Sequence, residues 1–301
     1  MKRVLTAVAL VPVVLLLLFK APWPVFVLAI ATVIILTLRE YLDVTEAYGM
    51  KPFRGLTYLV SILVVLAFTA YNYRWTSWML SEGFLSLIAL SYLLAVVFGV
   101  PVVLRKEMRM AVPAAAMSLL GILYIAVSLG LLIRFRHLPR NEYLIVFILF
   151  SVWGGDIAAY YVGKNFGRHK LAPVVSPNKS WEGAIASVIA SIGIALLVFH
   201  WRETLNAFFT HEPNTSILVP SPLGLPQIIV LGLITNIAAQ LGDLFESALK
   251  RGAGVKDSGT ILPGHGGVLD RIDALLFAIP VVWYYAELTG QFNTQVINLF
   301  P

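Results

Sequence analysis

The feature that most constrains this chain is a series of apolar runs, each close to the length of a membrane-crossing helix. Nine such runs lie near residues 1–19, 23–38, 56–72, 83–104, 111–133, 142–163, 181–200, 224–249 and 268–288. About 20 consecutive, mostly apolar residues are needed for an α-helix to cross the hydrocarbon core of a bilayer. Hydrophobic residues make up 59% of the 301-residue chain, and the mean hydropathy is +0.84. The sequence therefore predicts an all-α, polytopic integral membrane protein with about nine transmembrane helices.

The first run begins like a secretory signal peptide, with Met1-Lys2-Arg3 ahead of an apolar segment that reaches Phe19. The segment that follows, from Phe19 to Pro22, contains no small-x-small cleavage site. We therefore expect this run to be retained as the first transmembrane helix.

Lysine and arginine positions predict the orientation of the chain. With the N-terminus inside, most of the 22 lysines and arginines fall on the cytoplasmic side, as the positive-inside rule requires. Arg134, Arg136 and Arg140 are the main exception, because they cluster in an outer loop. The net charge of +6 suits an anionic membrane surface and anionic substrates. The absence of cysteine excludes disulfides and thiolate metal sites.

We divide the chain into two regions. Residues 1–140 are expected to form N-terminal transmembrane helices that act as a scaffold and contribute dimer contacts, with Trp23, Trp75 and Trp78 as interfacial anchors. No chemistry is evident in this half. Residues 141–301 are expected to form the catalytic transmembrane region.

Charge is concentrated between Leu241 and Asp273, although only 13% of the chain is charged. The acids and the cations of this stretch are Asp243, Glu246, Asp257, Asp270, Asp273, Lys250, Arg251, Lys256 and Arg271. One alternative is a solvated amphipathic face beside the membrane. That alternative accommodates Lys250 and Arg251, but it does not explain Asp243, which follows the apolar run 228–239.

This stretch reads as a helix, a loop and a second helix. Asp243, Ser247 and Lys250 share one helical face, and Asp270 and Asp273 share another at the start of the second helix. The loop contains residues that prevent a continuous helix, namely Gly252, Gly254, Gly259, Pro263, Gly264, Gly266 and Gly267. Carboxylates beside backbone amides that can approach a ligand closely suit a magnesium-bound polyphosphate. His265 in this loop has three open interpretations: a general base, a phosphate hydrogen-bond donor or an ordinary loop residue.

A second charged segment runs from Trp153 to Gly183. Asp156 lies within an apolar span, so it needs a partner, a metal or a water-filled cavity. The cations that follow are Lys164, Arg168, His169, Lys170 and Lys179. They suit a phosphate-bearing ligand, or they are only the positive-inside signal of a cytoplasmic loop.

The end of this segment is more specific. Residues 176–180 (Ser-Pro-Asn-Lys-Ser) are expected to form a turn that leads into a helix at Trp181, with Ser180 as its N-cap and Glu182 in its first turn. A helix N-terminus with a free lysine and hydroxyls is a good phosphate site. An ordinary capped helix start would explain Ser180, but not Asn178 or Lys179.

At these residues the chain resembles the phosphatidate cytidylyltransferase family, also called CDP-diacylglycerol synthase. The family signature S-x-x-K-R-x4-K-D-x-G-x2-L-P-G-H-G-G-x2-D-R-x-D is met here at every defining position, from Ser247 to Asp273. The upstream segment from Asp156 to Gly183 also resembles a motif of this family. The resemblance is strong from about residue 150 onward, and the first half matches only as apolar spans.

The resemblance implies transfer of a cytidylyl group from CTP to phosphatidic acid, giving CDP-diacylglycerol and pyrophosphate. It also implies a homodimer in the bacterial inner membrane, with the active site facing the cytoplasm and no nucleic-acid partner. Mg²⁺ is implied at Asp243 and Asp270. We expect Asp273 as a further ligand, and a second cation such as K⁺ beside the magnesium ion.

These expectations assign a role to each candidate residue. The residues expected to be catalytic are Asp243, Asp270, Lys250, Arg251 and Asp273. Those expected to bind substrate are Lys164, Ser176, Asn178, Lys179, Ser180, Ser247, Lys256, Asp257, His265, Gly266, Gly267 and Arg271.

Two other functions compete with this one. A transporter or channel with an acidic ion site would carry charges near the bilayer midplane and show repeated halves, and neither is evident. A CTP-dependent polyprenol or phytol kinase shares the nucleotide and the need for magnesium. The lipid product separates it from a cytidylyltransferase.

Overall fold

The computed structural model describes residues 12–18, 20–70, 83–105, 108–137, 141–209, 218–220, 223–261, 264, 266–292 and 294–296. Most of them are helical, as predicted. The helices are α2 (Trp23–Ala47), α3 (Arg54–Ala70), α5 (Gly83–Val103), α6 (Ala111–Gly121), α7 (Ser128–His137), α8 (Glu142–Phe166), α9 (Trp181–His200), α10 (Arg202–Phe209), α11 (Leu225–Gly252) and α12 (Leu269–Leu288). A π-helical segment, η1 (Ile122–Val127), joins α6 to α7.

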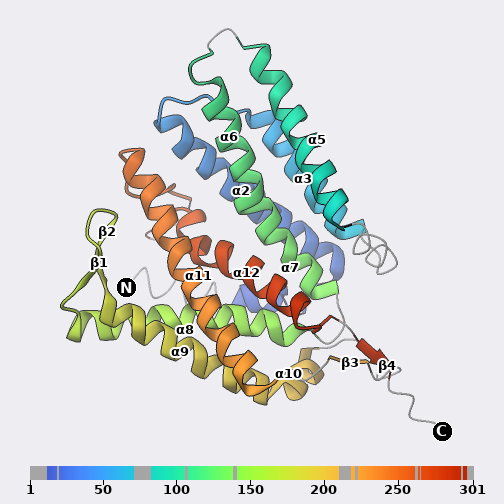
Figure 1. The fold of residues 1–301 in the computed structure, drawn as a ribbon, viewed down its shortest axis with the longest axis vertical. Helices are drawn as coiled ribbons and strands as arrows, with labels where there is room; N and C mark the ends of the chain where they lie inside the picture. Colours follow the sequence, from blue (N-terminus) through green and yellow to red (C-terminus); the bar gives the residue numbers. More distant parts are fainter. Residues whose placement is uncertain are drawn as a thin grey trace.

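Two short antiparallel strand pairs interrupt the helical fold. Strand β1 (Lys170–Ala172) pairs with β2 (Ser176–Ser180), and β3 (Leu218–Pro220) pairs with β4 (Thr294–Val296). Figure 1 shows the two pairs on opposite sides of the view.

Within the described residues, five helices are long and apolar enough to cross a membrane. They are Trp23–Ala47, Ala111–His137, Glu142–Phe166, Trp181–His200 and Leu225–Gly252. The predicted count of about nine is therefore not confirmed. α3 is a shorter apolar helix of 17 residues, and α12 carries Asp270, Arg271 and Asp273 in its first turns. Of the first predicted span, the structure describes only the helical residues 12–18.

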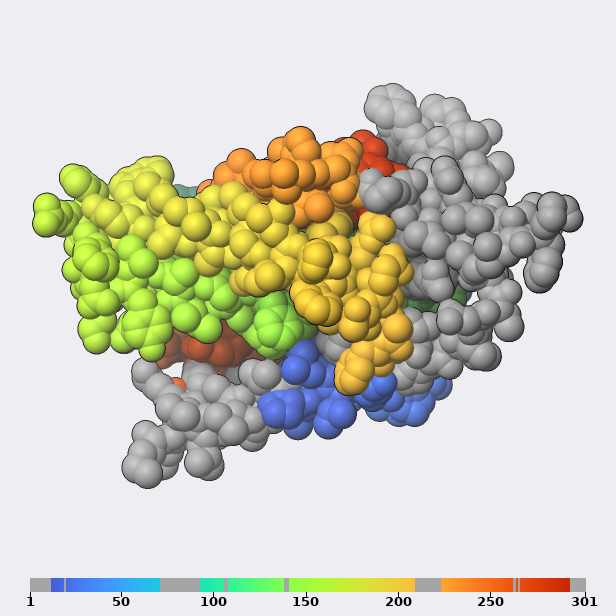
Figure 2. All heavy atoms as spheres, turned by 90° about the horizontal axis from the view of Figure 1, so that it is seen from below, coloured from blue at the N-terminus to red at the C-terminus, as the bar shows by residue number. Residues whose placement is uncertain are grey.

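Two pairs of helices lie on opposite sides of a central group. Figure 1 shows α8 and α9 running side by side in one region and α3 and α5 in the other, with α2, α7, α11 and α12 between them. α9 also packs along α11, and Figure 2 shows α11 beside α9 on the surface. Apolar side chains from α2, η1, α7, α8 and α12 form one buried core. Residues from both predicted regions thus meet in a single core, and the division into scaffold and catalytic regions stays a prediction.

Small residues let α8, α9 and α11 approach closely. A Cβ added to Gly155 would lie 2.6 Å from Asn236 Nδ2, and one added to Gly232 would lie 2.8 Å from Ile192 Cα. Asn236 Nδ2 donates to both Ser187 Oγ and Ser191 Oγ at 2.8 Å. Close packing and buried polar contacts of this kind join helices in membranes. They fix how the three helices lie against one another, and so they fix where the helix ends meet.

The outer arginine cluster proves to be part of the packing. Arg134 is buried, and Arg136 donates to Leu17 O at 2.8 Å and also to Ala21 O. The Arg136 guanidinium lies 4.6 Å from the ring centroid of Phe26, within the range of a cation–π contact. Arg134 and Arg136 are packed inside the protein and are not loop charges in solvent. Their position on the outer side is therefore a weaker objection to the predicted orientation. Arg140 lies outside the described residues.

Candidate active site

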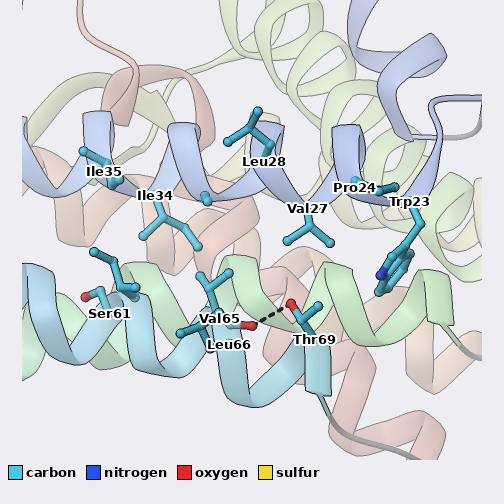
Figure 3. A pocket seen from close by; sticks show the side chains of 12 residues that line it. Trp23, Pro24, Val27, Leu28, Ile34, Ile35, Ser61, Val65, Leu66 and Thr69 are labelled. Atoms are coloured by element: carbon cyan, nitrogen blue, oxygen red, sulfur yellow. Dashed lines mark hydrogen bonds between the residues drawn. The ribbon is translucent and has the colours of Figure 1, made fainter.

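The structure contains two large cavities of contrasting chemistry. One, of about 510 Å³, lies between α2 and α3, and the described side chains that line it are uncharged. Figure 3 shows this cavity, with Val27 and Ile34 of α2 facing Val65 and Leu66 of α3. The cavity has two hydroxyl groups: Thr69 Oγ1 donates to Val65 O at 2.7 Å, and Ser61 Oγ is buried without a hydrogen-bond partner among the described residues. Because none of the described side chains that line this cavity is charged, the candidate active site is the other cavity.

The second cavity, of about 680 Å³, lies where α8, α9 and α11 meet the β1–β2 hairpin. Charged and polar side chains line it, including Asp156, Lys164, Lys170, Asn178, Lys179, Ser180, Gln240 and Asp243. Asp156 was predicted to need a partner, a metal or a cavity, and the cavity is confirmed. Four of the predicted substrate-binding residues, Lys164, Asn178, Lys179 and Ser180, are brought together here.

The hairpin corrects one local prediction and supports another. Residues 176–180 form strand β2 instead of a turn, because they pair with β1 in the register Lys170↔Ser180 and Ala172↔Ser176. Helix α9 begins at Trp181 as predicted, with Ser180 Oγ accepting a hydrogen bond from Gly183 N at 3.2 Å. Ser176 is half-buried in this strand and does not line the cavity.

Glycines bring the hairpin against the end of α8. A Cβ added to Gly183 would lie 2.8 Å from Ala159 O, and one added to Gly163 would lie 3.2 Å from Ser180 Oγ. A Cβ at Gly167 would overlap Gly163 O. Because the backbones approach so closely, lysines from α8 and from the hairpin line the same cavity.

Lys179 is not the free cation that the sequence suggested. Its Nζ atom lies 2.5 Å from Asp243 Oδ2, so an ion pair joins β2 to α11. Ser247 Oγ donates to the other oxygen of Asp243 at 3.4 Å, which is a long and therefore weak hydrogen bond. Asp243 thus lies between the cavity and the charged residues further along α11.

Lys250 belongs to a second, more buried group of charges. Its Nζ atom lies 2.6 Å from Glu246 Oε2 and 2.5 Å from Asp270 Oδ1. The carboxylate-bearing side chains are only 1% and 5% exposed, respectively. One ammonium group therefore pairs with two buried carboxyl groups, and it connects α11 to the start of α12.

The amides of the glycine-rich loop bind carboxylates of the protein itself. Asp270 Oδ2 accepts hydrogen bonds from Gly267 N at 2.7 Å and from Ser258 N at 3.0 Å. The amides of Val268 and Leu269 donate to Glu40 of α2, at 2.9 and 2.8 Å. These four amides are therefore occupied in this structure, and a phosphate-binding role for the rest of the loop stays a prediction.

Sequence reasoning missed Glu40. It lies two residues beyond the predicted end of the span 23–38, among charges typical of an ordinary cytoplasmic loop. In the structure α2 continues to Ala47, and Glu40 is a buried residue inside it. Its position just after an apolar span was the signal available, and its burial could be recognised only once the helix was known to extend to Ala47.

Asp273 lies where α11 and α12 touch. A Cβ added to Gly242 would lie 2.6 Å from Asp273 O and 3.3 Å from Ala274 Cα. This contact brings Asp273 next to the segment that carries Asp243. The predicted acidic residues of the two helices are thus gathered in one region.

The remaining predicted residues lie around this region. Arg251, Lys256, Asp257 and Arg271 are exposed. Gly266 and Gly267 lie against Asp270 and Glu40, respectively. His265 falls outside the described residues, so its role is untested.

Oxygen atoms, those of carboxylates among them, are the donors that a magnesium ion prefers. Among the described residues, no three acidic or histidine side chains gather tightly enough to form a complete metal site. Mg²⁺ is commonly held by only one or two carboxylates together with substrate phosphates and water. Asp243 and Asp270 supply such oxygen donors, so the residues present fit the ion in chemistry.

Taken together, a bundle of apolar helices with a cavity of lysines and carboxylates at the helix ends defines a membrane protein suited to a phosphate-bearing ligand. The family model described as the Cytidylyltransferase family matches residues 1–289. The chain belongs to this family, which confirms the resemblance seen in the signature.

Individual relatives carry a more specific name. A phosphatidate cytidylyltransferase from Synechocystis sp. is 32% identical over 315 residues, covering 95% of this chain and 96% of the relative. One from Staphylococcus saprophyticus is 36% identical over 206 residues, covering 68% of this chain and 70% of the relative. One from Haemophilus influenzae is 39% identical over 157 residues, and there the match spans only 50% of the relative.

Proposed function

We infer that this protein transfers a cytidylyl group from CTP to phosphatidate, giving CDP-diacylglycerol and pyrophosphate for phospholipid biosynthesis. A relative of this name matches 95% of the chain. The observation that carries the inference is the cavity at the helix ends, where Lys164, Lys170 and Lys179 gather beside Asp243. Such a cavity suits a triphosphate, while the apolar helices keep the diacyl substrate in the bilayer.

The reaction requires charge neutralisation more than a nucleophilic side chain. A phosphate oxygen of the lipid attacks the α-phosphorus of CTP, and the bond from that phosphorus to the bridging oxygen of the β-phosphate breaks. Pyrophosphate leaves with that oxygen. Because two anions must approach, positioning and electrostatic stabilisation supply most of the rate enhancement. The cavity lysines neutralise the triphosphate in this proposal, and Lys179 exchanges its contact with Asp243 for one with a phosphate.

Mg²⁺ is part of this proposal. Asp243 and Asp270 would hold it, with Asp273 as a further ligand, and a second cation such as K⁺ would balance the remaining acids. Bound there, magnesium would withdraw negative charge from the phosphates of CTP. The support is the oxygen-donor chemistry of the three aspartates and the contact of α11 with α12 at Gly242.

We also propose a homodimer in the bacterial inner membrane with the cavity facing the cytoplasm. The C-terminal ends of α2, α8 and α11 and the N-terminal ends of α9 and α12 carry the site residues. These are the ends that the positive-inside rule assigns to the cytoplasm.

The position of the radioactive label tests the reaction. Purified protein receives phosphatidic acid, Mg²⁺ and CTP labelled at either the α- or the γ-phosphorus. Cytidylyl transfer moves the α-label into lipid and releases the γ-label as pyrophosphate. A lipid that carries only the γ-label would refute the proposal and indicate a kinase.

Two variants and a control test the metal assignment. Asp243→Asn and Asp270→Asn should each abolish turnover, whereas Asp43→Asn removes an exposed carboxylate on α2 and should leave turnover unchanged. Chelation with EDTA should stop the wild-type reaction, and added Mg²⁺ should restore it. Near-normal turnover in either site variant would count against the assignment.

A further inference from the structure

Glu40 uses both of its oxygens to hold a distant loop. Oε1 accepts from Val268 N at 2.9 Å, and Oε2 accepts from Ser258 Oγ at 3.0 Å and Leu269 N at 2.8 Å. The residue is 2% exposed, and among the described residues it forms no ion pair with a lysine or arginine. A buried carboxylate is costly unless hydrogen bonds satisfy it. All three donors here come from the segment that carries Asp270 or leads to it.

The same loop segment holds Asp270. Ser258 makes both contacts, because its side chain donates to Glu40 while its backbone amide donates to Asp270 Oδ2 at 3.0 Å. The next contacts come from three consecutive amides. Gly267 N donates to Asp270, whereas the amides of residues 268 and 269 donate to Glu40. These amides lie at the start of α12, where free N–H groups and the helix dipole favour an anion. Glu40 therefore caps α12 from another helix.

Three signature glycines leave room for these two carboxylates. A Cβ added to Gly259 would lie 2.6 Å from Glu40 Oε1, and one added to Gly266 would lie 2.6 Å from Asp270 Oδ2. A Cβ at Gly267 would overlap Glu40 Oε2. Gly266 also has a φ of 77°, which a residue with a side chain rarely adopts. The glycine pattern thus fits the protein's own carboxylates.

We propose that Glu40 is a positioning residue for the reaction: it fixes residues 258 and 267–269, which hold Asp270 Oδ2 and leave Oδ1 for Lys250 and for the Mg²⁺ proposed above. Lys250 Nζ lies 2.5 Å from that Oδ1 atom. Glu40 touches no reacting group in this account and acts only through Asp270. The proposal rests on the proposed function, and it gives the N-terminal half of the chain a part in the active site.

Glu40→Gln is the first test. An amide in place of the carboxylate keeps one acceptor oxygen but turns an N–H group toward backbone donors. We expect kcat to fall roughly 10- to 100-fold, as for other residues that orient catalytic ligands. The KM for CTP should stay within about threefold, because Glu40 does not line the cavity. Glu46→Gln, on the exposed face of the same helix, is the matched control and should change neither constant.

Hydrogen exchange supplies a readout that does not depend on activity. The amides of residues 258 and 267–269 should exchange faster in Glu40→Gln than in wild type, and Glu46→Gln should not affect them. If the wild-type protein shows no cytidylyl transfer, the proposed function fails while the exchange pattern still tests the contact. A kcat within threefold of wild type in folded Glu40→Gln would overturn the positioning role.

A compensating pair separates positioning from general stability. Gly259→Ala places a methyl group against Glu40 Oε1, and Glu40→Asp withdraws the carboxylate by one methylene. The double variant should therefore have a higher kcat than the product of the two single effects predicts. Simple multiplication of the two losses would contradict the proposal. If Glu40→Gln does not fold, Ser258→Ala removes the side-chain link alone, and a kcat within threefold of wild type there would also refute it.

Discussion

Replacing Lys250 by methionine should destabilise the protein far more than replacing an exposed cation does. The substitution keeps a long apolar side chain but removes the ammonium group. Glu246 and Asp270, with side chains 1% and 5% exposed, then lose the cation that lies within 2.6 Å of each. Removing one partner of a buried ion pair typically costs about 3–5 kcal/mol, since the remaining charge is left uncompensated. That cost lowers the folding equilibrium constant roughly 150- to 5,000-fold.

The assay is unfolding of purified protein in mixed micelles, followed by circular dichroism as the fraction of SDS increases, with EDTA present and no nucleotide. Arg54→Met is the control. Its guanidinium pairs with Asp43 and Glu46, but the Arg54 side chain is 32% exposed, so the expected loss is about 0.2–1 kcal/mol. Adding Glu246→Gln to Lys250→Met should recover part of the loss, because one buried charge is removed. A loss below about 1 kcal/mol for Lys250→Met would refute the reasoning.

Three further substitutions test the local contacts. Gly242→Leu should force α11 away from α12 at Asp273, lowering both the melting temperature and turnover, at a cost of about 1–3 kcal/mol. Gly99→Leu is its control, because an added Cβ there meets nothing within 4 Å. Tyr48→Phe removes a 2.7 Å hydrogen bond to Leu249 O and should cost about 0.5–1.5 kcal/mol in thermal unfolding, and an unchanged melting temperature would contradict it. Ser180→Ala removes the N-cap of α9 and should cost about 1 kcal/mol, while Ser180→Asn, which also caps, should cost less.

Local signals in the sequence predicted local structure well. The start of α9 at Trp181 and its cap at Ser180 follow from a serine placed immediately before an apolar helical run, and both are confirmed. The need of Asp156 for a polar environment follows from one residue and its apolar neighbours, and a cavity is present. Charges concentrated within one short stretch also identified the region where α11 meets α12.

Contacts between distant parts of the chain could not be predicted in this way. Glu40 binds residues 218 to 229 positions later in the sequence, and no periodicity or spacing reports such a pairing. Lys179 and Lys250 were expected to be available to phosphates, but tertiary packing places carboxylates against both. The hairpin was missed because its first strand has only three residues. The span count of about nine is not confirmed: within the described residues, α12 has charged first turns that interrupt its apolar pattern, and α3 is only 17 residues long.

The pairing of Glu40 with Ser258 also sets an order of events during biosynthesis. A ribosome that adds about 5–20 residues per second needs roughly 10–45 s to make the 218 residues that separate the two partners. During that interval α2 is already made, while the donors for its carboxylate do not yet exist. A buried carboxylate without hydrogen-bond partners is costly. The nascent helix therefore has to keep this end hydrated at the membrane surface until α12 arrives, and docking of α12 completes the burial of α2.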